Sequence, residues 1–202
     1  MIETNILLVY LSTCIIAALS PGPGMVAVLS SSINQGLAKT LPLMMGLLFG
    51  LIFMSIISTI GLGLVLASSK FIYNIITFTS AFYLCYMGLC SISFARNKVN
   101  LDSENYSFFS GVIISVLNPK TLVFFTTLFP TFISEDAPLS LQVLVLTVIL
   151  VASTFSVHLL YAGIFSKLSN YYLSLSIYIN WAVGGVFIAL GLSSIYLIFY
   201  VS

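Results

Sequence analysis

Six long apolar stretches constrain this chain more than any other feature of its sequence. Their expected bounds are 5–33, 41–67, 71–95, 106–133, 139–165 and 177–200. A helix crosses the hydrocarbon core of a bilayer with about 20 apolar residues, so each stretch is long enough to span it. Six basic and five acidic side chains, 5% of the residues, cannot cover a water-facing surface. The sequence therefore predicts an all-α integral membrane protein, a single transmembrane domain over residues 1–202 with about six spans.

The basic residues between these stretches predict the orientation. The loops after the first, third and fifth spans contain Lys39, Arg96, Lys98 and Lys167, whereas those after the second and fourth contain only Lys70. Because basic loops stay in the cytoplasm, we expect both termini on the opposite side of the membrane. We also expect the first span to be retained, since no basic residue precedes it as in a secretory signal.

Two weak internal matches suggest a duplication. Residues 88–92 (Gly-Leu-Cys-Ser-Ile) and 191–195 (Gly-Leu-Ser-Ser-Ile) share four of five residues, and mid-span prolines recur 96 to 98 residues apart. Two halves, about 1–100 and 101–202, would each contain three spans. Because three is odd, the second half would be inverted in the membrane, an architecture found in transporters.

The first span is interrupted by Pro21, Gly22, Pro23 and Gly24, which follow Ser20 directly. Proline has no N–H to donate and pushes the preceding residue out of the helical conformation, so the helix should stop here. In hydrocarbon, the freed backbone groups must be satisfied by protein or by a wet cavity. A harmless kink is the alternative, but two prolines and two glycines in succession favour a functional break.

The fourth span contains a similar interruption at Asn118, Pro119 and Lys120. Lys120 is the one fixed charge that we place well inside a span, and a charge there costs at least about 2.5–3.5 kcal/mol on insertion scales. A span shifted in register would bring Lys120 to an interface instead. The apolar run at 121–132 favours the deep position.

The two breaks together predict a solute-binding site. Half-helices that start after the breaks present free N–H groups and the positive end of the helix dipole, which favour an anion, and Lys120 adds a full positive charge. The carbonyls freed by the prolines favour a cation, so the site suits a zwitterion such as an amino acid. The predicted substrate-binding residues are Pro21, Gly22, Pro23, Gly24, Asn118, Pro119, Lys120, Tyr83 and Tyr86.

Three features have both a functional and a packing interpretation. Tyr83 and Tyr86 in the third span either line the solute path or only pack. His158 in the fifth span can titrate near neutral pH and is a candidate proton relay, although a lone intramembrane histidine is more often a packing residue. Gly46 and Gly50 form a Gly-x-x-x-Gly pattern, which predicts close packing on another helix or, in a homo-oligomer, on a second copy.

These motifs resemble those of the LysE/RhtB family of amino-acid exporters. The matching residues are Pro21-Gly22-Pro23, Gly36, Gly46, Gly50, Tyr83-Leu84-x-Tyr86-x-Gly88, Gly111, Leu117-Asn118-Pro119-Lys120, Phe124-Phe125, Phe129-Pro130 and Gly191-Leu192. The resemblance implies a bacterial inner-membrane protein that exports amino acids or related metabolites, driven by the proton gradient. It is not expected to be an enzyme, and it needs no cofactor.

One departure from the family narrows the expected substrate. Family members that export basic amino acids carry acidic residues within spans, and this chain has no Asp or Glu in any expected span. A neutral, threonine- or homoserine-like compound is therefore expected. The net charge of +1 provides no basic face for nucleic acid, so the expected partners are a small solute and the lipid bilayer.

Several other functions remain as alternatives. A membrane enzyme would need more catalytic groups than His158 alone. It would also need a motif such as Gly-x-Ser-x-Gly, which this chain lacks. A thiol-redox carrier would need a second intramembrane thiol in the fourth span to match Cys14 in the first. A metal-ion exporter would need intramembrane acids, histidines or cysteines as ligands, and we expect no metal site. An exporter of another small solute and a structural membrane protein stay open.

Overall fold

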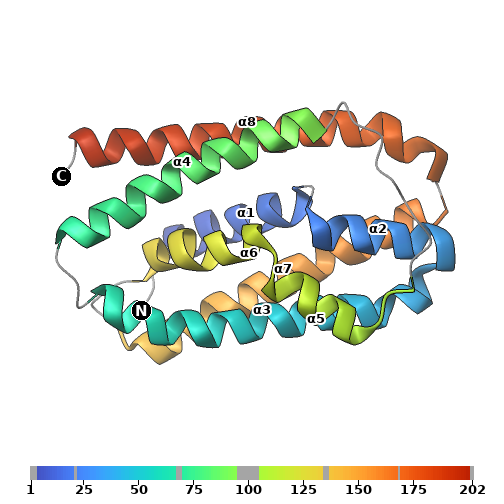
Figure 1. The fold of residues 1–202 in the computed structure, drawn as a ribbon, viewed down its shortest axis with the longest axis horizontal. Helices are drawn as coiled ribbons and strands as arrows, with labels where there is room; N and C mark the ends of the chain where they lie inside the picture. The colour runs from blue at the N-terminus through green and yellow to red at the C-terminus, as the bar shows by residue number, and fades with distance from the viewer. Residues whose placement is uncertain are drawn as a thin grey trace.

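The computed structural model describes residues 4–20, 22–66, 70–94, 105–133, 137–167 and 169–200, and all regular structure within these ranges is helical. The long helices lie roughly side by side along one axis (Figure 1). The elements are α1 (Thr4–Leu19), α2 (Pro23–Gln35), α3 (Leu37–Leu66), α4 (Lys70–Phe94), α5 (Phe108–Val116), α6 (Pro119–Val123), η1 (Phe124–Leu128), η2 (Phe129–Phe132), α7 (Leu139–Phe165) and α8 (Ser169–Tyr200). The prediction of an all-α protein is confirmed for these residues.

The described helices include two to four candidate membrane spans. Leu37–Ile60 of α3 and the whole of α7 are each long and apolar enough to cross a bilayer. Two bent pairs would add one span each, α1 with α2 at 58° and α5 with Pro119–Phe132 at 53°. Both breaks thus occur where the sequence predicts them. The count of six, which also requires α4 and α8, stays a prediction.

The last helix is longer than the sequence predicts. It begins at Ser169 rather than near residue 177. An apolar stretch marks the part of a helix that suits hydrocarbon, whereas the helix itself can continue beyond that part into more polar residues, so the expected span from residue 177 stays a prediction.

Both breaks use the same local device to restart the helix. Pro21 lies outside the described residues, but α1 ends at Leu19 and α2 restarts with Pro23 in its first turn. In the second pair, Pro119 occupies the corresponding place in α6. A proline is well tolerated at the first helical position, where its missing N–H would have no helical partner. The two prolines are 96 residues apart.

Glycines let α3 and α5 approach each other closely. A Cβ on Gly46 would collide with the carbonyl oxygen of Phe108, and one on Gly50 would lie 2.5 Å from the Cβ of Ser115. Gly111 on α5 is in equally close contact with the backbone of α3. The predicted packing of the Gly46 and Gly50 face on another helix is therefore confirmed, and the partner helix belongs to the same chain.

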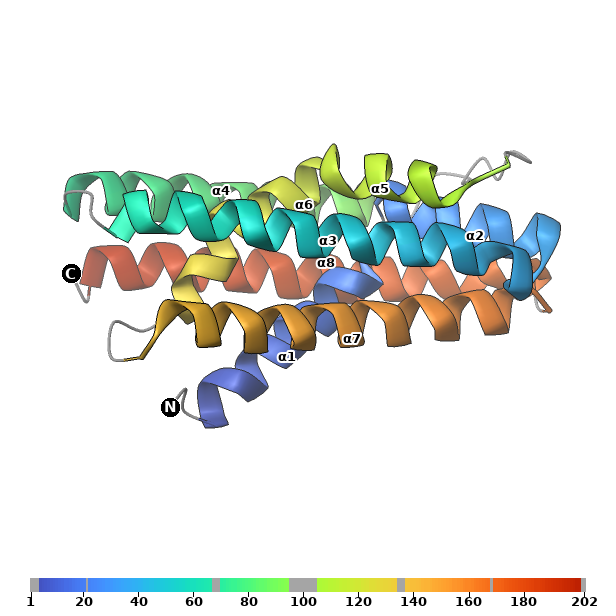
Figure 2. The ribbon, with the colours of Figure 1, turned by 90° about the horizontal axis from the view of Figure 1, so that it is seen from below.

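The helices α4 and α8 form a second close pair, and they run in opposite directions (Figure 1). A Cβ on Gly88 would lie 2.7 Å from the carbonyl oxygen of Gly184, and one on Gly191 would lie 2.7 Å from that of Ala81. Figure 2 shows α7 on the other side of the bundle, beside α3 and the oblique α1. Of the two broken pairs, α1 lies between α7 and α8, whereas α5 packs along α3.

Candidate functional site

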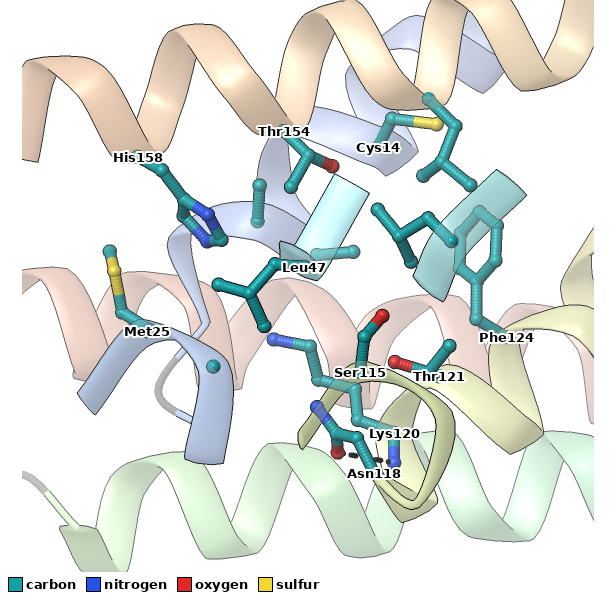
Figure 3. Close-up of a pocket in the computed structure, with 15 residues that line it drawn as sticks. Cys14, Met25, Leu47, Ser115, Asn118, Lys120, Thr121, Phe124, Thr154 and His158 are labelled. Carbon is teal, nitrogen blue, oxygen red and sulfur yellow. Dashed lines mark hydrogen bonds between the residues drawn. The ribbon is translucent and has the colours of Figure 1, made fainter. Parts of the chain in front are cut away.

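A pocket lies where the two breaks meet the middle of α3 and α7 (Figure 3). The empty space within it, including the open mouth, is about 600 Å³. The lining residues are Cys14, Ala17, Ala18, Gly24, Met25, Leu47, Leu51, Ser115, Asn118, Lys120, Thr121, Phe124, Leu150, Thr154 and His158.

Lys120 connects the two breaks through a hydrogen bond. It lies in the first turn of α6, and its Nζ donates to the carbonyl oxygen of the buried Ser20 at 3.0 Å. Ser20 directly follows the end of α1, where the helix dipole places partial negative charge. The ammonium group is thus held by a helix end, and none of the described residues that line the pocket is acidic.

The first turn of α2 presents backbone N–H groups that no side chain caps. Its N-cap is Gly22, which has no side chain to accept from them, and Gly24 and Met25 of this turn line the pocket. A Cβ on Gly22 would lie 3.5 Å from Lys120 Nζ, so the ammonium group is close to this helix start. Free N–H groups, the positive end of the α2 dipole and a lysine together favour an anion.

The start of α6 is different, because a side chain already caps it. The Oδ1 atom of Asn118 accepts the backbone N–H of Lys120 at 3.0 Å. Asn118 itself is buried and lines the pocket. Of the two half-helix N-termini that the sequence predicts as anion sites, only that of α2 is therefore uncapped.

The opposite side of the pocket is formed by α7. Thr154 and His158 lie one helical turn apart, are 7% and 6% exposed, and both line the pocket. Figure 3 shows their side chains projecting from α7 toward the pocket, while Lys120 reaches in from α6. The Nδ1 atom of His158 has no hydrogen-bond partner among the described residues.

An aromatic cluster lies behind the pocket wall at Phe124. The ring of Tyr10 lies 6.2 Å from that of Phe124 and also contacts Phe129 and Phe132, at 6.4 and 4.8 Å between centroids. Phe124 begins the π-helical segment η1, a conformation that is rare and often found at functional sites.

The structure brings some of the predicted site residues together and separates others. Among the substrate-binding residues predicted by sequence, Gly24, Asn118 and Lys120 line the pocket; so does His158, the candidate relay. Gly22, Pro23 and Pro119 shape the breaks beside it, and Pro21 lies outside the described residues.

Tyr83 and Tyr86 are not part of the pocket lining. They lie on α4, their ring centroids are 5.8 Å apart, and Tyr86 is 55% exposed. Sequence reasoning also missed Cys14 and Thr154 as lining residues. Each is a small polar residue in an apolar helix, and the available signal for Thr154 was its spacing of four residues from His158.

A helical membrane protein with a small, mostly apolar pocket that contains a few polar groups between two broken helices has the architecture of a solute transporter. The family profile of the LysE type translocator matches residues 15–197. The chain belongs to this family, which is a family of transporters rather than enzymes, and the resemblance found in its motifs is confirmed.

Individual relatives are similar over most of their length. An uncharacterized membrane protein of Vibrio cholerae is 28% identical over 200 residues, which cover 94% of this chain and 96% of the relative. The uncharacterized membrane protein YrhP of Bacillus subtilis is 29% identical, with 71% and 75% covered. A homoserine/homoserine lactone efflux protein of Salmonella typhimurium is 30% identical, with 69% and 70% covered. No solved structure matches this chain.

Proposed function

We propose that this protein exports neutral amino acids or related metabolites of the threonine or homoserine type. The observation that carries the proposal is the Lys120 ammonium group, which is held at the end of α1 beside an uncapped helix start, in a pocket whose described lining residues include no acidic side chain. The efflux protein of Salmonella typhimurium, 30% identical, is named for homoserine and its lactone, which supports this solute class.

The solute carboxylate would bind between Lys120 and the first turn of α2. A carboxylate there accepts charge-assisted hydrogen bonds from the ammonium group and from the backbone N–H groups near Gly24. The solute amino group would donate to the carbonyls at the ends of α1 and α5, where the helix dipoles favour a cation. A basic amino acid would bring a second positive charge into a pocket that already contains Lys120, which is why we propose neutral solutes.

We also propose that six spans form two inverted repeats. The helices α3, α7 and α8 run along most of the length of the bundle, and α4 lies antiparallel against α8 (Figure 1). The contact between Gly88 and Gly184 has a counterpart between Gly191 and Ala81. With an offset of 103 residues, Gly88 corresponds to Gly191 and Ala81 to Gly184, as expected for a two-fold relation between α4 and α8.

The orientation in the bacterial inner membrane, with both termini outside, has similar support. The start of α1 and the end of α8 lie at the same end of the bundle, and α3 begins and α7 ends at the other end (Figure 1). The exposed Lys39 and Lys167 are close to these two helix ends, where basic residues would face the cytoplasm. Proton coupling stays a prediction, and a relay role of His158 is the alternative that a His158→Gln variant distinguishes. A homo-oligomer stays a prediction.

Export of labelled amino acids tests this function. Purified protein in proteoliposomes, or cells that express it, should export threonine and homoserine, and Lys120→Met should abolish export while the protein still inserts into the membrane. Lys120→Arg is the matched control, since it keeps the charge but not the shape of the ammonium group. Full activity of Lys120→Met would place the solute elsewhere. Absence of export for every amino acid would refute the proposed solute class.

A further inference from the structure

His158 is a buried polar residue whose hydrogen bonding the fold leaves incomplete. Its side chain is 6% exposed and lines the pocket, and its Nδ1 atom has no partner among the described residues. Buried polar atoms without a partner are rare and destabilising, so each one calls for an explanation. The His158 side chain borders the pocket, so a group of a bound solute is a natural partner for it.

Thr154 adds a hydroxyl to the same wall. It lies four residues before His158 on α7, so both side chains project from one face of the helix. In Figure 3 these two side chains lie on one side of the pocket and Lys120 on the other, with Leu47 between them. The pocket therefore has two polar regions, one charged at Lys120 and one neutral at His158 and Thr154.

We propose that His158 and Thr154 determine specificity for hydroxylated over aliphatic amino acids. The inference rests on the proposed function, in which Lys120 and α2 bind the solute carboxylate. The neutral region would then contact the side chain of the solute. A hydroxyl group both donates and accepts, so it can pair with an imidazole nitrogen and a threonine hydroxyl together. An aliphatic side chain in the same place would leave these buried atoms unpaired, which is how sites built for a hydroxyl reject its analogue.

Two matched solute pairs test the inference. Threonine and valine, and likewise homoserine and norvaline, differ only by a hydroxyl in place of a methyl group. We expect wild-type protein in proteoliposomes to prefer the hydroxylated member by about tenfold or more in the concentration for half-maximal transport. His158→Leu should remove this preference. His158→Gln should keep it, because an amide also donates and accepts.

Each other outcome overturns the inference in a distinguishable way. Equal transport of both members by the wild type would leave amino-acid export intact but refute the specificity role. If His158→Gln loses transport of both members of a pair alike, His158 has a titrating role. If His158→Leu keeps the preference for the hydroxylated member, His158 is only a packing residue. Absence of any amino-acid transport by the wild type would refute the proposed function itself. If the His158→Leu protein does not accumulate in the membrane, Thr154→Val can be tested instead, because it only exchanges a hydroxyl for a methyl group. The preference of this variant for the hydroxylated solute must also fall.

Discussion

Gly22→Asp should block the solute site by giving the pocket an internal carboxylate. A Cβ at residue 22 would lie 3.5 Å from Lys120 Nζ, so an aspartate carboxylate can reach the ammonium group. From the N-cap position it can also accept the free N–H groups of α2, as Asn118 already does for α6. The new side chain would occupy both groups that we assign to the solute carboxylate.

The expected magnitude follows from these contacts. A hydrogen bond to a charged group contributes roughly 1.5–3 kcal/mol, and about 1.4 kcal/mol is a factor of ten. The concentration for half-maximal export should therefore rise by about 10- to 150-fold in Gly22→Asp. Gly22→Asn adds only a neutral cap, which exceeds glycine by about 0.3 kcal/mol and corresponds to less than about a twofold rise.

Gly22→Ala is the matched control, because its Cβ makes an ordinary van der Waals contact with Lys120 Nζ and brings no acceptor. Its half-maximal concentration should stay near that of the wild type. Gly22→Asp should also melt at a higher temperature in detergent than Gly22→Ala, since its carboxylate pairs with Lys120. A higher melting temperature together with a higher half-maximal concentration would indicate competition with the solute, whereas a misfolded variant would melt at a lower temperature. Equal half-maximal concentrations for the Asp and Ala variants would refute the assignment of the carboxylate site.

Two further predictions concern packing and the pocket wall. Gly46→Ala should lower the melting temperature in detergent, because its Cβ meets a carbonyl oxygen of α5 and overpacking costs about 1–3 kcal/mol. Gly163→Ala should leave the melting temperature unchanged, because nothing lies within 4 Å of its Cβ. Equal melting temperatures of the two variants would contradict the close approach of α3 and α5. Cys14 lines the pocket but is fully buried, so in a Cys85→Ser and Cys90→Ser background a small thiol reagent should label it slowly, and a transported solute should slow this labelling further. Labelling at the same rate with and without solute would place Cys14 outside the solute path.

The sequence by itself determined the class of fold and the places where it breaks. Scarce charges and long apolar stretches leave a bilayer as the only suitable solvent, and this depends on composition alone. Pro23 and Pro119 stop and restart their helices through their own missing N–H groups, which is a local effect. Lys120 stood out for the same kind of reason, because a charge inside an apolar run is costly wherever the chain places it.

Only the tertiary structure decided which of these features share a site. The contact between Lys120 and Ser20 joins residues 100 positions apart, and no local pattern encodes it. Tyr83 and Tyr86 fell outside the pocket because α4 packs on α8, whereas Thr154 entered it because α7 packs on α1, α2 and α3. In so apolar a chain, hydrophobicity does not tell which face of a helix meets lipid and which meets protein. That choice depends on how closely the helices fit, and glycine contacts between distant segments determine this fit.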